Sequence, residues 1–191
     1  SINKSHFIGA DYGMENIMGI AINPVRQVLN YASDHFAQDM PIIYMQTVVG
    51  KDENGKLVFR HIPGWNGRCR PGESFPASDC NQKLIGATWY NAGWGGDAGT
   101  KATFPYEFIS PRDADGHGSH TASTAAGNYG VEVTVGSNDL GMISGMAPRA
   151  RIAAYKVCWG VGEGGCFGSD SVAAIDQAVV DGVDVLNFSI S

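Results

Sequence analysis

Charged side chains are scarce in this chain of 191 residues, at 17% of the sequence, and the mean hydropathy is only -0.11. A disordered acidic segment contains more charge than this, and a membrane-spanning protein has a higher hydropathy. Hydrophobic residues make up 43% of the chain, a share typical of soluble globular domains. The length suffices for one sizeable core, so we expect one main domain with an irregular neighbour and no membrane partner.

A basic surface is also lacking. Thirteen Lys and Arg residues stand against nineteen Asp and Glu, which gives a net charge of -6, and the basic residues are scattered along the chain. A phosphate backbone would therefore find no continuous positive surface. We expect no nucleic-acid partner.

Cysteine is sparse and lacks the Cys-x-x-Cys spacing of zinc sites. The four cysteines form two close pairs in turn-rich stretches, Cys69 with Cys80 and Cys158 with Cys166. This favours two local disulfides, an oxidising compartment and a secreted protein, and the alternative is four reduced thiols. Residues 1–10 do not form a signal peptide, so a secreted protein would have lost its leader or would begin inside a longer precursor.

The first 60 residues predict a helix and then a strand. Apolar residues recur at helical spacing between Pro24 and Phe36, and a buried strand follows at 40–49. Residues 62–100 are rich in Pro, Gly, Trp, Asn and Ser, which indicates a surface loop region held by a Cys69–Cys80 disulfide. Its one apolar stretch is KLIGATWY at 83–90.

Regular structure is expected again after residue 110. The predicted elements are a helix of small residues at 116–126, a hairpin or irregular loop at 131–146, a strand at 151–157, a helix at 169–181 and a strand at 183–191. The last strand is apolar on both faces, as an interior parallel strand would be. Strand, helix and strand in this order predict a right-handed crossover, and therefore an α/β fold with a parallel sheet and flanking helices.

The helix at 169–181 has a specific expected orientation. Ser169 or Asp170 is the predicted N-cap, because both side chains can accept a backbone hydrogen bond. Val172, Ile175 and Val179 are spaced to face the sheet.

Functional groups are densest in SPRDADGHGSHTAS at 110–123, which contains Asp113, Asp115, His117 and His120. A calcium loop that starts at Asp113 would need a carboxylate where Thr124 stands, and the two histidines give zinc only two ligands. Two histidines packed among glycines is the structural alternative. We expect neither a metal nor another cofactor.

The remaining interpretation of this cluster is a catalytic histidine at a helix N-terminus. There the helix dipole disfavours the imidazolium form, so the ring can accept a proton. His117 suits this role because Gly116 and Gly118 leave room for a substrate and a nucleophile. His120, one turn later, is expected to point inward or toward the same wall as His117, and to be structural.

Four ordered blocks resemble the subtilisin-like serine peptidases, the subtilases, and within them the plant-subtilase-like branch. They are WNGRCRPGESF with CNQKLIGA at 65–87, SPRDADGHGSHTAS, GMAPRARIAAYKVCW at 145–159 and GSDSVAAIDQAVVDGVDVLNFSIS at 168–191. The resemblance implies a subtilisin-like fold, a polypeptide substrate and His117 as general base. It also implies that the backbone of Ser189, Ile190 and Ser191 binds an extended peptide as an added strand.

Three features of that family are missing. The family's catalytic aspartate lies in an Asp-Thr/Ser-Gly motif, and here the nearest match is Asp11 in Asp-Tyr-Gly, which is either the histidine's partner or a turn residue. The oxyanion-hole asparagine and the Gly-Thr-Ser-Met-Ala nucleophile motif do not occur. We therefore expect an incomplete catalytic domain at 61–191, inactive by itself, behind a helix-strand segment of uncertain origin at 1–60.

Residues 15–50 are also similar to the helix and strand of isochorismatase-like cysteine hydrolases, but that family's lysine and nucleophilic cysteine cannot be located.

The sequence as a whole leaves three candidate functions. The first is a subtilase-type endopeptidase that acts in a longer protein. The second is a non-catalytic subtilase remnant that binds, and the third is a cysteine hydrolase.

Overall fold

The computed structural model describes residues 17–21, 48–54, 57–59, 62 and 64–189. The strands are β1 Ile17–Ala21, β2 Val48–Lys51, β3 Leu57–Phe59, β4 Leu84–Trp89, β5 Val131–Val135, β6 Asn138–Ile143, β7 Arg151–Lys156, β8 Cys158–Trp159, β9 Gly165–Cys166 and β10 Val185–Asn187. The α-helices are α2 Gly96–Thr103, α3 His117–Ala126 and α4 Gly168–Asp181, and short 3-10 turns lie at η2 Ala77–Asp79 and η3 Ala92–Trp94.

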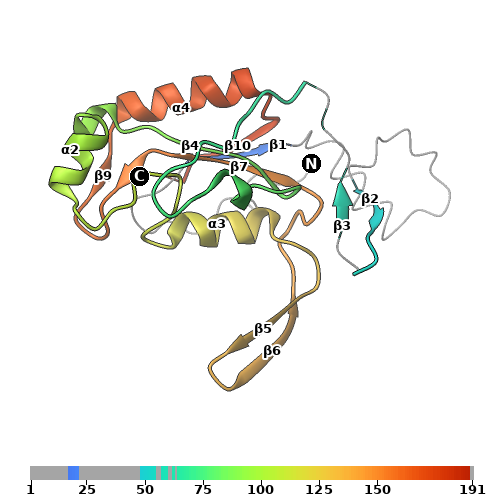
Figure 1. The fold of residues 1–191 in the computed structure, drawn as a ribbon. Coiled ribbons are helices and arrows are strands. Elements are labelled where there is room, and N and C mark those ends of the chain that lie inside the picture. The colour runs from blue at the N-terminus through green and yellow to red at the C-terminus, as the bar shows by residue number, and fades with distance from the viewer. Residues whose placement is uncertain (1–16, 22–47, 55–56, 60–61, 63, 190–191) are drawn as a thin grey trace.

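A four-stranded sheet in the order β10-β1-β7-β4 forms the centre of the fold. β4 and β7 run parallel, whereas β1 is antiparallel to both β7 and β10. Figure 1 shows α4 on one face of this sheet and α3 on the other. The expected α/β class, with a parallel pair and flanking helices, is confirmed.

The core follows from the alternation of side chains along β7. Ala153 and Tyr155 are buried against α4, in a cluster with Ala174 and Ala178. On the opposite face, Ile152 packs against a cluster of buried alanines from α3 and the segment before β7. β7 is therefore covered on both faces.

β10 was predicted to be an interior parallel strand, and this prediction is wrong. Among the described residues it lies at the end of the sheet, and its ladder partner is β1, which runs antiparallel to it. β7 and β10 still run in the same direction, because β1 is antiparallel to each of them. The two strands that α4 connects, β7 and β10, are therefore separated in the sheet by one strand, β1.

The expected inner face of α4 is also wrong. Val172 and Val179 are exposed, whereas Ala174 and Ala178 are fully buried and Ile175 is partly buried. The valines and the alanines are both at helical spacing, so either set could face the sheet. The alanines face it because their small side chains let the helix lie close to β7.

The predicted N-cap of α4 is wrong as well. The helix begins at Gly168 behind Phe167, and no side chain caps it. Asp170 is buried, and both of its carboxylate oxygens accept the backbone N–H of Gly93 at 3.2 Å. The carboxylate therefore joins α4 to the turn η3 instead of capping its own helix.

The region 62–100 is more regular than expected. β4 is a strand of the main sheet with Ala87 and Trp89 buried, and α2 forms in spite of Gly96 and Gly99. Glycine has a low helix propensity, which is why the sequence pattern did not predict α2.

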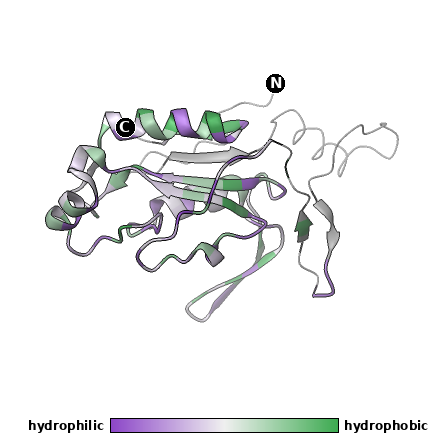
Figure 2. Ribbon diagram, turned by 45° about the horizontal axis from the view of Figure 1, so that its top comes forward, coloured by the Kyte–Doolittle hydropathy of each residue, from purple (hydrophilic) through white to green (hydrophobic). Residues whose placement is uncertain are grey.

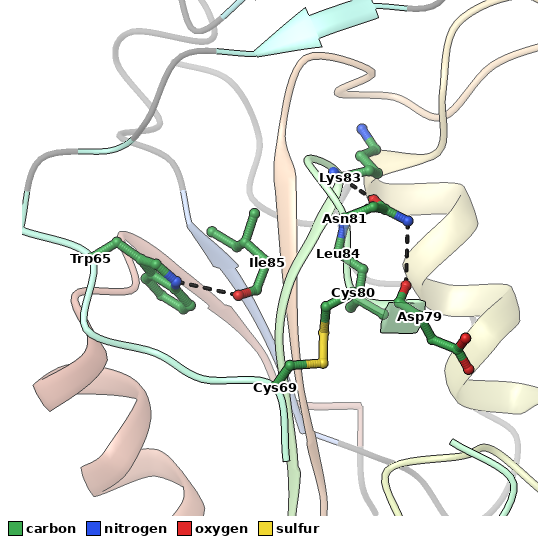
Figure 3. The surroundings of a disulfide bond; sticks show 8 residues. All are labelled: Trp65, Cys69, Asp79, Cys80, Asn81, Lys83, Leu84 and Ile85. Atoms are coloured by element: carbon green, nitrogen blue, oxygen red, sulfur yellow. Dashed lines mark hydrogen bonds between the residues drawn. A yellow bond between two sulfur atoms is a disulfide. The ribbon is translucent and has the colours of Figure 1, made fainter. Parts of the chain in front are cut away.

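Both predicted disulfides are present, Cys69–Cys80 and Cys158–Cys166. Figure 3 shows the first, which fixes the segment around Cys69 beside the outer edge of β4. In that segment the N–H of Arg70 donates to the carbonyl of Ala87 in β4 at 2.8 Å. The second joins β8 to β9.

Several predictions fall on residues outside the described part of the chain. The helix expected between Pro24 and Phe36 lies there, and so does most of the strand expected at 40–49. Only Val48 and Val49 of that strand are described, in β2.

The hairpin expected at 131–146 is confirmed as β5 and β6. No helix in the described ranges has the length and apolar character needed to cross a membrane.

Candidate active site

His117 is the first residue of α3, as predicted. Gly116 precedes it with φ 98°, a conformation that only glycine adopts readily, and so the chain turns sharply into the helix. The next residue, Gly118, is buried, as are Thr121 and Ala125 further along the helix. Small residues on this face let α3 lie against the sheet and leave His117 half-buried at its end.

Asp113 organises the start of α3. One carboxylate oxygen accepts the N–H of Asp115 at 3.1 Å and of Gly116 at 2.9 Å. The other accepts the backbone N–H of Ser119 at 2.7 Å and its hydroxyl at 2.8 Å. Asp113 therefore supplies the side-chain cap that Gly116 cannot provide.

These hydrogen bonds also fix the charge of Asp113. Partial burial favours the protonated form, but the bonds from Gly116, Ser119 and Asp115 outweigh it and hold the pKa of Asp113 below its ordinary value. Asp113 is thus an anion that stabilises the positive end of the α3 dipole.

A buried ion pair fixes the segment that leads to α3. Lys156, at the end of β7, donates to a carboxylate oxygen of Glu107 at 2.8 Å, and both side chains are 3% exposed. Lys156 also donates to the carbonyl of Arg112 at 2.9 Å. Glu107 in turn accepts the N–H of Gly160 at 2.9 Å. The loop before His117 is thereby tied to the central sheet.

Burial lowers the pKa of Lys156, and the hydrogen bond and negative charge of Glu107 oppose this shift. The ammonium group also lies 4.2 Å from the ring centroid of Trp159, which adds a favourable cation-π contact.

Of the two orientations expected for His120, the inward one is wrong and the one toward the side of His117 agrees with the structure. His120 is exposed, and its ring stands nearly perpendicular to that of His117, with 6.5 Å between the centroids. Residues separated by three positions lie on the same side of a helix, so His120 shares the outer side of α3 with His117.

The end of β10 lies at the same edge of the sheet as the start of α3. Met18 of β1 is opposite both Asn187 and Ala154, and therefore Ser189 is level with Lys156. Ser189 is buried, and its hydroxyl donates to Asn187 at 3.2 Å. The structure thus brings Ser189 and His117 to one edge, whereas Ile190 and Ser191 lie outside the described residues.

Asp11 also lies outside the described residues. β1 enters the sheet at this same edge, because its first residue, Ile17, is opposite Tyr155 near the end of β7.

Sequence reasoning missed two features of this site. Glu107 and Lys156 are 49 positions apart, and no local pattern links them. Asp113 was considered only as a metal ligand, although an aspartate shortly before a helix start is a recognisable capping signal.

A cavity of about 410 Å³ lies between α3 and the sheet. Its walls include Ala122 of α3, Leu84 of β4 and Ile152 of β7, and Asp113 and Lys156 border it. His117 itself does not line the cavity, but the two residues that follow it in α3, Gly118 and Ser119, do.

All four cysteines of the chain are in disulfides, which leaves no thiol nucleophile. The isochorismatase-like alternative, whose nucleophile would be a cysteine thiol, is therefore not favoured.

Comparison with known proteins agrees with the motifs. The model of the Subtilase family matches residues 34–191. The chain is 50% identical over 127 residues to subtilisin-like protease SBT1.4 of Arabidopsis thaliana, and 48% identical over 126 residues to SBT1.5 of the same plant. These alignments cover 66% of the chain and 16% of each relative. By the extent of the family match, which takes in His117 and the buried pair behind it, the chain belongs to the subtilase family.

Proposed function

We propose that the complete protein is a secreted serine endopeptidase and that His117 is its general base. The observation that carries this proposal is the position of His117 at the start of α3, behind a glycine with φ 98° and beside the capping carboxylate of Asp113. Membership of the subtilase family supports the reaction class.

In this mechanism His117 takes the proton of a serine hydroxyl while that oxygen attacks a peptide carbonyl. It then returns the proton to the leaving amine. The serine comes from a segment beyond these 191 residues, which contain no nucleophile motif. The Asp113 cap and the Glu107–Lys156 pair hold the start of α3, so that the imidazole meets the serine in a fixed geometry.

The substrate is an extended polypeptide. Its backbone pairs with Ser189, Ile190 and Ser191 as an added strand. The location of Ser189 at the edge where α3 begins supports this arrangement.

Asp11 is the candidate that orients the second ring nitrogen of His117. The entry of β1 at the same edge supports this assignment. Replacing Asp11 by Asn in the complete protein should lower kcat while leaving KM nearly unchanged, and an unchanged kcat would remove Asp11 from the mechanism.

Two disulfides favour an oxidising compartment, and secretion is the simplest route to one.

Replacing His117 by Ala in the complete protein tests the assignment directly. We expect kcat to fall by at least about three orders of magnitude with little change in peptide binding, because the ring acts on the proton in transfer.

His120→Ala is the matched comparison, since His120 lies on the same side of α3 and is exposed. Its effect on kcat should be modest. If the rate collapsed in the His120 variant and not in the His117 variant, the role of general base would pass to His120.

A further inference from the structure

The hairpin of β5 and β6 extends away from the sheet and helices, beyond the C-terminal end of α3 (Figure 1). It nevertheless carries apolar stretches, which are green in Figure 2. The exposed large apolar side chains of its strands are Val131, Val135, Leu140, Met142 and Ile143. An isolated two-stranded sheet that buries neither face is marginally stable in water. The exposed apolar side chains therefore indicate that another surface covers this hairpin.

The base of the hairpin is firmly attached. After β6, the N–H of Met146 donates to the carbonyl of Thr124 at 2.9 Å, and that of Ala147 donates to Ala125 at 2.9 Å. The last turn of α3 therefore fixes the direction in which the hairpin projects.

The edges of the hairpin are not protected. Natural edge strands carry Lys or Pro, which discourage pairing with another chain. Residues 131–143 contain neither, and their only charges are Glu132 and Asp139. Within the described ranges β5 pairs with β6 alone, so its other edge is open.

The two edges differ in regularity. Glu132 is opposite Met142 and Thr134 is opposite Asp139, so β6 has one residue more than β5 between these pairs. This bulge includes Gly141 with φ 73°, and it distorts the β6 edge. β5 is continuous and is the edge better suited to accept another strand.

The sequence of β5, VEVTV, is complementary to itself. When two copies pair antiparallel about Val133, Val131 lies opposite Val135, and Glu132 lies opposite Thr134. The valines then share one face, and a carboxylate meets a hydroxyl donor instead of a like charge. The same operation on β6 would place Asp139 opposite Met142.

We propose that the hairpin is a dimerisation element, in which β5 of one chain pairs antiparallel with β5 of a second copy. The two hairpins form a four-stranded sheet whose central ladder is centred on Val133. This inference does not depend on peptidase activity, because the hairpin contains no residue of the candidate active site.

Cysteine cross-linking of the 191-residue chain tests the register. All native cysteines are in disulfides, so one introduced cysteine is the only free thiol. Val133→Cys should form a disulfide dimer on mild oxidation, because directly opposite residues lie within disulfide range. Val131→Cys and Val135→Cys should each cross-link poorly alone, yet a mixture of the two should give a heterodimer.

Light scattering on the unmodified chain gives an independent measurement that needs no variant to fold. We expect a mass that rises toward that of a dimer with concentration. Val133→Lys should weaken the dimer at least tenfold, because two lysines would meet at the centre, whereas Asp139→Lys on β6 should leave it unchanged. A monomer at every soluble concentration, or cross-linking that ignores the register, would overturn the proposal.

Discussion

Single side chains decide how the start of α3 is held. Gly116 permits the turn into the helix but offers no capping group, and Asp113 supplies the missing acceptor from three positions earlier. One carboxylate thereby satisfies the N–H groups of Asp115, Gly116 and Ser119, of which the last two lie at the helix start. The position of His117 at the helix start therefore depends on the cap that Asp113 provides.

Replacing Asp113 by Ala should therefore destabilise the chain by about 1 to 2 kcal/mol, the usual cost of losing an N-cap. The low pKa of Asp113 means that its stabilisation is present above its ordinary pKa and is lost as the pH falls through the folded value. The difference between the two proteins should thus shrink in acid. Chemical unfolding at several pH values measures it.

Asp115→Ala is the control, because only the backbone of Asp115 takes part in the cap. Equal losses in both variants would show that the carboxylate of Asp113 is not the cause.

Lys83 gives a second dependence on pH. Its ammonium donates to the carbonyls of Pro148 and Ala150 at 2.8 and 2.6 Å. Burial, helped by the positive charge of Arg151, lowers the pKa of Lys83 to about 8. A neutral amine keeps two N–H donors, so both hydrogen bonds survive deprotonation.

Between pH 8 and the ordinary lysine value of 10.5, the unfolded chain binds more protons at Lys83 than the folded chain does. The free energy of unfolding should therefore rise with pH in this interval, with a slope of up to about 1.4 kcal/mol per pH unit from this group. Lys83→Met should remove that slope when both proteins are unfolded in urea. An identical slope in the variant would mean that Lys83 does not titrate there.

Helices and strands were predictable where one pattern dominates. The small residues at 116–126, the hairpin at 131–146 and the strand at 151–157 are all found. α4 was predicted with the wrong face, because periodicity alone cannot choose between valines and alanines at the same spacing. Close approach to Tyr155 makes that choice, and it is a tertiary effect.

The packing of α4 can be tested by exchanging residue size on its two faces. Ala174→Val should cost about 1 to 3 kcal/mol, because Ala174 is fully buried and the added methyl groups overpack the contact with β7. Val179→Ala should change stability by less than about 0.5 kcal/mol, since Val179 is 70% exposed. If the urea midpoint fell more in Val179→Ala than in Ala174→Val, the valines and not the alanines would be the side of α4 that packs on the sheet.

The assembled chain combines local features, which a short stretch of sequence specifies, with contacts between distant segments. The position of His117 at the start of a helix and the two disulfides were predictable, since their signals are local in the sequence. The Glu107–Lys156 pair and the antiparallel insertion of β1 were not, because each joins segments that are far apart along the chain. Long-range pairing of this kind is decided by the folded core, which no short pattern describes.

The 191-residue chain should have no serine-peptidase activity, because it contains neither the nucleophile motif nor the oxyanion-hole asparagine. A fluorophosphonate probe, which reacts with activated serines, should leave the folded chain unlabelled. Stoichiometric labelling of one serine would show that these residues hold a complete catalytic centre.

The buried Glu107–Lys156 pair behind the candidate active site also constrains how the sequence can change. A mutation that removed either Glu107 or Lys156 would strand its partner's charge in the interior, at a cost of about 3 to 5 kcal/mol. Such an intermediate consumes much of the stability of an ordinary domain. The two positions should therefore change together, so that related sequences keep both residues or replace both.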